Sequence, residues 1–212
     1  RKLSGLLRLD LLARDGVDAA DGLIKTTLSG SGAQYLNIID RARSRLLSLE
    51  EEFNDSGNYG LAFSKLVNVE ATLTKYKTQE AKLDFGDFIS RYVEIVNPPE
   101  LDLLIVDEAQ DLTPSQWQMV AKMSESATRT IIAGDDDQAI HEWTGVKVED
   151  FLSCSDKRVV LSQSYRMPQA VHNLSQMIVK RIDNRIVKEF EPTDREGSIR
   201  YHVNIETVPL DT

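Results

Sequence analysis

Two adjacent carboxylates end a short apolar run in the middle of the chain. The stretch LLIVDEAQD covers residues 103–111, so Asp107 and Glu108 follow Val106 directly. Adjacent side chains at a strand end point in different directions, so one can hold Mg²⁺ while the other orients or deprotonates a water molecule. Alternatively, Asp107 and Asp111 only cap backbone amides of the turn. This stretch alone leaves both readings open.

A second acidic stretch, IIAGDDDQAIHEWTG, covers residues 131–145. It places Gly134 where a strand must turn, followed by aspartates 135–137 and Gln138. Consecutive carboxylates repel one another, so we expect a nearby cation. The spacing excludes an EF-hand loop, which needs alternating ligands and a late glutamate.

Trp143 stands between Glu142 and Thr144 in the same stretch. An exposed tryptophan in such polar surroundings is a platform on which a nucleic-acid base can stack. A tryptophan that folds back into the core is the alternative.

A third stretch, LSQSYRMPQAV, places Tyr165 and Arg166 after another apolar run. An arginine can neutralise charge that develops on a phosphate, and a tyrosine can stack on a base. A basic cluster follows, which is either a solvated face or a phosphate contact; it comprises Lys180, Arg181, Arg185 and Lys188.

The elements that must position these residues change in character near residue 97. Apolar residues recur at helical spacing over 34–53, about 60–78 and about 84–96. The predicted helix over 34–53 buries one face, made of Tyr35, Ile38, Ile39, Ala42, Leu46, Leu49 and Phe53. The glycine-containing stretch 28–33 is predicted to be a loop.

Three apolar runs of strand length follow, at 101–106, 130–133 and 158–161. The first is predicted to be buried on both faces. Helices are predicted from Pro114 to about residue 124 and over 168–180. This alternation indicates an α/β fold with a parallel sheet, in which ligands bind beyond the carboxyl ends of the strands.

Composition limits the classes of protein that remain. The chain has 212 residues and a net charge of −9, which argues against a general nucleic-acid coat. Residues 50–150 carry 8 basic and 21 acidic side chains, a net charge of −13. The single cysteine, Cys154, excludes an intramolecular disulfide, and the scattered histidines do not suggest zinc. No apolar run is long enough to cross a membrane, and no signal peptide is visible.

Three motifs in this order, DEAQD, GDDDQAIHEWTG and LSQSYR, resemble those of superfamily 1 DNA helicases of the UvrD/Rep type. The resemblance covers about residues 84–203. It implies part of a RecA-like, parallel-sheet P-loop NTPase core with a mainly helical insertion.

The resemblance also implies roles for single residues. The catalytic residues would be Glu108, which activates water, Gln138, which links the γ-phosphate to the DNA site, and Arg166, which reaches the γ-phosphate. Nucleotide would be bound by Asp107 through Mg²⁺ and by Tyr165 and Arg166. Single-stranded DNA would stack on Trp143 and His141.

Two positions depart from the family pattern, because it usually has an aromatic residue at position 141 and an arginine at position 144. The chain has no Gly-Lys pair, which a phosphate-binding loop requires. We therefore expect a fragment that begins after this loop and is inactive alone. The helical insertion would occupy 1–97, the first motor core 98–157 and the start of the second motor domain 158–212.

The expected function is an ATP-dependent DNA helicase that uses ATP and Mg²⁺ to translocate on single-stranded DNA and unwind duplex junctions. Replication or repair proteins are the expected partners, in the cytoplasm of a bacterial, archaeal or phage-infected cell. A non-catalytic module that binds DNA or protein is the alternative. An RNA helicase or a helicase–nuclease subunit would fit the same motifs as the DNA helicase.

Overall fold

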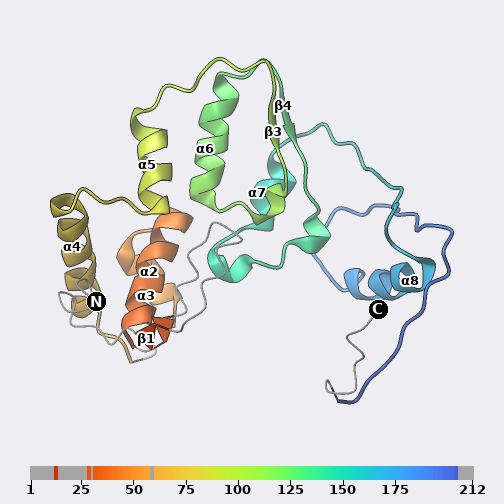
Figure 1. Cartoon of the computed structure of the whole chain (residues 1–212), viewed down its shortest axis with the longest axis horizontal. Coiled ribbons are helices and arrows are strands. Elements are labelled where there is room, and N and C mark those ends of the chain that lie inside the picture. Colours follow the sequence, from red (N-terminus) through yellow and green to blue (C-terminus); the bar gives the residue numbers. More distant parts are fainter. Residues whose placement is uncertain (1–11, 14–27, 30, 58–59, 205–212) are drawn as a thin grey trace. The chain divides into compact units, whose positions relative to one another are not determined.

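The computed structural model describes residues 12–13, 28–29, 31–57 and 60–204 (Figure 1). The chain divides into two compact units. The first unit comprises residues 1–135 and 139–150, and the second comprises residues 136–138 and 151–212. No helix among the described residues is both long enough and apolar enough to cross a membrane.

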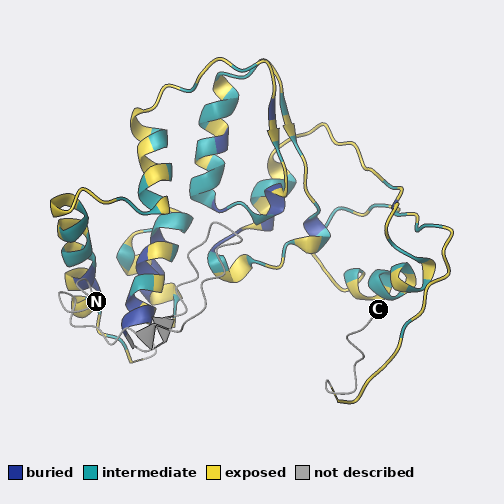
Figure 2. Cartoon of the chain, viewed as in Figure 1, coloured by how far each residue is buried: buried dark blue, intermediate teal, exposed yellow. Residues whose placement is uncertain are grey.

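The first unit contains a helical part whose core is formed by α2 (Ser31–Arg45), α3 (Leu49–Asp55) and α4 (Phe63–Gln79). Buried side chains from the three helices pack together there. They are Tyr35, Ile38, Ile39, Phe53, Leu66 and Val69. Buried positions are dark blue on the ribbon of Figure 2. The helical periodicity of the sequence therefore identified the core face of this part.

The helix predicted over 34–53 is wrong in its continuity, because the chain breaks between α2 and α3. Leu46 adopts a left-handed backbone conformation with φ of 58°, and its side chain is 48% exposed instead of lying on the core face. Ser48 then starts α3 through a capping box. Its hydroxyl accepts a hydrogen bond from the Glu51 amide, and the Glu51 carboxylate accepts one from the Ser48 amide. A new helix therefore begins at this cap, although the apolar repeat of the sequence continues through it.

Two short antiparallel strands, β1 (Leu12–Ala13) and β2 (Leu28–Ser29), pair with each other before α2. The loop predicted over 28–33 is therefore corrected. Its first two residues form a strand, and α2 begins at Ser31. Gly30 lies outside the described residues.

The α/β part of the first unit contains a small parallel sheet. Strand β3 (Leu104–Val106) pairs with β4 (Thr130–Ile132), and Ile105 lies opposite Ile131. Helix α6 (Pro114–Glu125) connects them and begins with a Thr113 capping box and a proline at its first position, as predicted. Helix α5 (Phe85–Ile95) packs beside α6 (Figure 1). The structure is thus a mixed α/β arrangement with a small parallel sheet.

Two predictions about the strands are wrong. β3 is not buried on both faces, because Leu104 is buried whereas Ile105 is 61% exposed. Only two paired strands form this sheet in the described part of the chain, and Ile131, opposite Ile105 on β4, is also exposed. Residues 158–161 form no strand, and Val159 and Leu161 are more than four-fifths exposed.

The second unit contains α8 (Gln169–Val179), which begins after Pro168 and confirms the helix predicted there. Ahead of it, an isolated parallel bridge joins Gln163 to Glu191. Helix α7 (Val148–Ser153) precedes the extended stretch that leads to this bridge.

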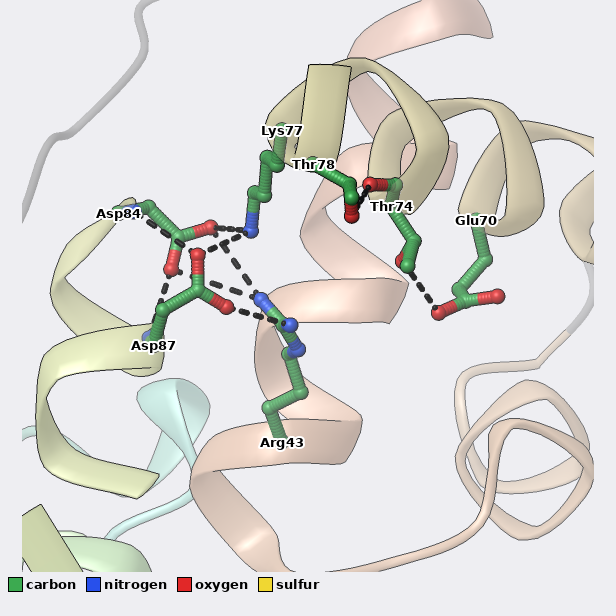
Figure 3. A network of polar contacts seen from close by, with 7 residues as sticks. All are labelled: Arg43, Glu70, Thr74, Lys77, Thr78, Asp84 and Asp87. Atoms are coloured by element: carbon green, nitrogen blue, oxygen red, sulfur yellow. Dashed lines mark hydrogen bonds and ion pairs between the residues drawn. The ribbon is translucent and has the colours of Figure 1, made fainter. Parts of the chain in front are cut away.

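Charged side chains join three helices of the first unit (Figure 3). Asp84 and Asp87 form the capping box that begins α5. Arg43 of α2 contacts Asp87 at 2.8 Å and Asp84 at 3.2 Å, and Lys77 of α4 pairs with both carboxylates. The aspartates that start α5 therefore also fix it to α2 and α4.

Two acids have perturbed pKa values: Asp87 in this network, and Asp40, whose carboxyl group is influenced by the network's charges. Burial alone raises the pKa of Asp87, but hydrogen bonds from the Asp84 amide and Lys77 lower it to about 2. Asp40 keeps part of its surface in solvent, yet the protein around its carboxyl group and the nearby Asp84 raise its pKa from 3.8 to about 6, against the opposing effect of Arg43. The folded state therefore binds the Asp40 proton more tightly than the unfolded state does.

The Asp40→Asn variant should test this assignment. Because its folded-state pKa is raised, Asp40 contributes stability below 3.8 that is lost as the pH rises through about 6. The Tm of the variant minus that of the parent should increase from about pH 4 to about pH 7. Asp102→Asn, at an exposed position, is the control. A difference that stays flat with pH would contradict the assignment.

Candidate functional site

The acidic turn after β3 presents two exposed carboxylates. Asp107 Oδ1 accepts a hydrogen bond from the Glu108 amide at 2.9 Å. Glu108 adopts a left-handed conformation with φ of 51° and ψ of 38°, which is rare for a residue other than glycine. Such strained positions concentrate where a side chain must be aimed for function.

A buried glutamine that the sequence analysis missed holds this turn in place. Gln110 is 2% exposed, and its side-chain amide donates to Glu108 Oε2 at 2.8 Å. Its carbonyl oxygen accepts from the Asp135 amide at 2.9 Å. The same two turns are also joined by the Ala109 amide, which donates to the Ala133 carbonyl at 3.0 Å. Gln110 therefore fixes the turn after β3 to the turn after β4.

The capping alternative for the first motif accounts for only one contact. Asp107 does accept one backbone amide, that of the next residue. Asp111 instead accepts from the Gln110 side chain at 3.4 Å, and its second oxygen is buried without a hydrogen-bond partner among the described residues. Leaving a carboxylate oxygen unsatisfied is costly, so this turn is not arranged only to cap itself.

The donor set of this turn fits Mg²⁺. Carboxylate oxygens are the ligands that this ion prefers, and it commonly takes one or two of them together with waters and substrate phosphates. Asp107 and Glu108 offer exposed carboxylates, and one oxygen of Asp111, four positions after Asp107 in the chain, is buried without a hydrogen-bond partner among the described residues. No group of three or more His, Cys, Asp or Glu side chains gathers around a possible metal position in the described residues, so waters and substrate phosphates would supply the remaining ligands.

The aspartates of the second motif are divided between the two units. Asp135 belongs to the first, and Asp136 and Asp137 belong to the second. There, Arg185 donates to both carboxylate oxygens of Asp137 at 2.6 and 2.7 Å, and Lys188 pairs with Asp136. The cation expected near these aspartates is therefore provided by basic side chains of the protein. The alternative that Arg185 and Lys188 form a solvated face is wrong.

Gln138 follows these aspartates at the end of a short 3₁₀ helix, η2 (Asp136–Gln138), and is exposed. It belongs to the second unit together with Tyr165 and Arg166.

Trp143 is 59% exposed, so its placement in the core is wrong. It lies on a second 3₁₀ helix, η3 (Glu142–Thr144), with its ring edge-on to that of His141 at a centroid distance of 6.4 Å. Gly145 closes this loop with φ of 101°, and a Cβ there would lie 2.4 Å from Cγ of Arg45. The loop backbone therefore packs closely on the stem of an arginine from α2.

Tyr165 and Arg166 follow a buried serine in the second unit. The Ser164 hydroxyl accepts hydrogen bonds from the Arg166 amide at 3.3 Å and from the Met167 amide at 3.0 Å. The Ser164 amide donates to the Glu191 carbonyl at 2.8 Å. Both site side chains are exposed, Tyr165 by 88%. The serine turns the backbone so that two consecutive side chains face solvent.

Comparison with known proteins agrees with these motifs. A family model described as the UvrD/REP helicase N-terminal domain matches residues 9–158. The chain belongs to the UvrD/Rep helicase family.

Curated relatives carry helicase names. The chain is 24% identical over 187 residues to the ATP-dependent DNA helicase PcrA of Staphylococcus epidermidis, covering 79% of this chain and 25% of that protein. It is 37% identical over 68 residues to the ATP-dependent DNA helicase Rep of Escherichia coli, covering 30% and 10%. The match to the putative ATP-dependent DNA helicase YjcD of Bacillus subtilis is 24% over 131 residues, covering 55% and 17%. The chain thus spans a quarter or less of the length of these relatives.

Gln110→Ala should destabilise the protein by about 1–3 kcal/mol, because it removes a buried side chain that donates to Glu108 and accepts from the half-buried amide of Asp135. Urea unfolding measures the loss. Gln118→Ala, at an exposed position of α6, is the matched control and should change the free energy of unfolding little. Equal unfolding midpoints for both variants would show that the two turns are not held by Gln110.

Proposed function

We propose that this chain is part of an ATP-dependent DNA helicase that couples ATP hydrolysis to translocation on single-stranded DNA and to duplex unwinding. One observation carries the proposal: a strained turn places two exposed carboxylates beyond a parallel strand and is fixed by Gln110 to the next strand's turn. In parallel α/β sheets this edge is where nucleotides bind. Membership of the UvrD/Rep family and the names of the relatives support it.

On this proposal the first motif binds Mg²⁺ and activates the attacking water. Asp107 would hold Mg²⁺, which when bound neutralises phosphate charge, and Glu108 would accept a proton from the attacking water. Glu108 adopts a left-handed backbone conformation, and the Gln110 amide holds one of its carboxylate oxygens. The other oxygen remains available for a proton.

The other motifs supply contacts to nucleotide and DNA. Tyr165 would stack on the adenine base, and Arg166 would neutralise charge on the γ-phosphate. Gln138 would link the γ-phosphate to the DNA contacts. Trp143 and His141 would stack on bases of single-stranded DNA, for which the exposed tryptophan ring is suited.

The proposed organisation follows the motifs. Residues 98–157 would belong to a RecA-like core of the P-loop NTPase type, 1–97 to a helical insertion and 158–212 to the second motor domain. Duplex DNA junctions would be the substrate, and replication or repair proteins in a prokaryotic or phage-infected cytoplasm the partners. The alternative function, a non-catalytic module that binds DNA or protein, would show no ATP turnover.

In the full-length protein, Glu108→Gln should stop ATP turnover while leaving Mg·ATP binding largely intact. The carboxamide keeps size and hydrogen bonding but cannot accept a proton, so we expect a loss of at least about 10²-fold in kcat. Phosphate release with oligo-dT measures turnover, and fluorescence of a labelled nucleotide measures binding. Near-normal turnover in the variant would assign the base elsewhere, and no turnover in the parent would favour the module.

Trp143→Ala should weaken binding of single-stranded DNA by about 1–3 kcal/mol, the usual contribution of one base–aromatic stack. The variant should melt close to the parent, because the ring is mostly exposed. Fluorescence anisotropy with labelled oligo-dT reports affinity, and a thermal melt reports stability. Trp143→Phe, which keeps an aromatic face, should restore much of the affinity. An early melt with unchanged affinity would remove Trp143 from the DNA contacts.

A further inference from the structure

Two aspartates and two basic residues form a set of ion pairs in the second unit. This four-charge cluster consists of Asp136, Asp137, Arg185 and Lys188. Arg185 binds Asp137 with two parallel hydrogen bonds of 2.6 and 2.7 Å, and Lys188 contacts Asp136 directly and Asp137 at 3.3 Å. The exposed fractions of the four side chains are 2–14%. Two positive and two negative charges therefore neutralise one another with little access to water.

The cluster also fixes the backbone of the partner segment. Asp136 Oδ2 accepts a hydrogen bond from the Ile186 amide at 2.6 Å. Residues 181–190 form no helix or strand, so their backbone lacks the regular hydrogen bonds of those elements. A paired arginine and carboxylate define one geometry more strictly than a single contact does. Removing one partner would leave a mostly buried charge with fewer compensating contacts.

The position of the cluster in the chain connects it to the proposed site. The residue before it, Asp135, is held through its amide by Gln110. The residue after it is Gln138, which is exposed. The backbone that carries Gln138 is thus anchored at three successive residues, 135–137, by contacts that reach residues 110 and 185–188.

We propose that Arg185 and Lys188 are positioning residues that set the placement of Gln138 by clamping the two aspartates before it. This inference rests on the proposed function and adds to it the residues that position Gln138. The two basic residues act through the aspartates and do not bind phosphate themselves. Because catalytic groups must be held to a fraction of an ångström, a loosened clamp slows the chemical step more than it weakens nucleotide binding.

The test compares Arg185→Met, Asp137→Asn and the double variant in the full-length protein. With saturating oligo-dT, each single variant should lower kcat for ATP by about 10- to 100-fold, the size expected for misplacing a catalytic group. The KM for ATP should stay within about threefold, because the groups that bind the nucleotide are unchanged. The double variant should be no slower than the slower single variant, because both changes break one contact.

Two further variants complete the design. Arg185→Lys keeps the charge but loses the paired geometry, so its kcat should lie between those of the parent and Arg185→Met; it also serves if methionine prevents folding. Arg181→Met removes a neighbouring exposed charge and should match the parent.

Three results would overturn the inference: single-variant losses in kcat that add in the double variant, a lower Tm with unchanged kcat, or an Arg185→Met variant whose kcat is normal but whose DNA affinity falls. The last result would make Arg185 a phosphate contact. A parent without DNA-stimulated ATPase activity would instead overturn the proposed function, and this inference with it.

Discussion

The buried side-chain amide of Gln110 connects the turns that follow the two parallel strands of the first unit. It donates a hydrogen bond to the carboxylate of Glu108 and accepts one from the amide of Asp135, so one residue contacts both motifs. The strands alone align their ends, but they do not fix the turns beyond them. Because Gln110 does this from a buried position, the exposed carboxylates of Asp107 and Glu108 lie on a rigid support.

The acidic residues of the chain fall into two groups, those paired with basic side chains and those in no ion pair among the described residues. Residues 50–150 carry a large excess of negative charge, yet several of these acids are engaged by basic side chains. Arg43 and Lys77 bind the carboxylates at the start of α5, and Arg45 binds the buried Glu52. Asp136 and Asp137 are neutralised in the same way. Asp107 and Glu108 take part in no ion pair in the part of the chain that the structure describes, and both are exposed, so an external cation can reach them.

The sequence predicted the elements that are defined by local signals. Thr113 with Pro114 starts α6, and Pro168 precedes α8, because capping groups act over a few residues. The break at Leu46 was missed because a capping box at Ser48 overrides an apolar repeat that continues through it. The apolar run 158–161 resembles a strand, but strand formation requires a neighbour, and none pairs with it here.

The candidate site residues are proposed from residue types and motif order, whereas the contacts that support them were not predicted. Nothing in the spacing of Gln110 shows that its two ends reach two different turns, because Asp135 is 25 residues away in the chain. The same holds for Arg185 and Asp137, which are 48 residues apart. Long-range polar contacts of this kind depend on the folded backbone, so a single sequence does not reveal them.

The central claim is that the turn after β3 serves ATP hydrolysis coupled to DNA. Steady-state phosphate release by the full-length protein, measured with Mg·ATP with and without oligo-dT, tests it most directly. The account predicts release that depends on Mg²⁺ and rises severalfold when single-stranded DNA is added. Tight binding of the oligonucleotide without phosphate release in either condition would contradict it.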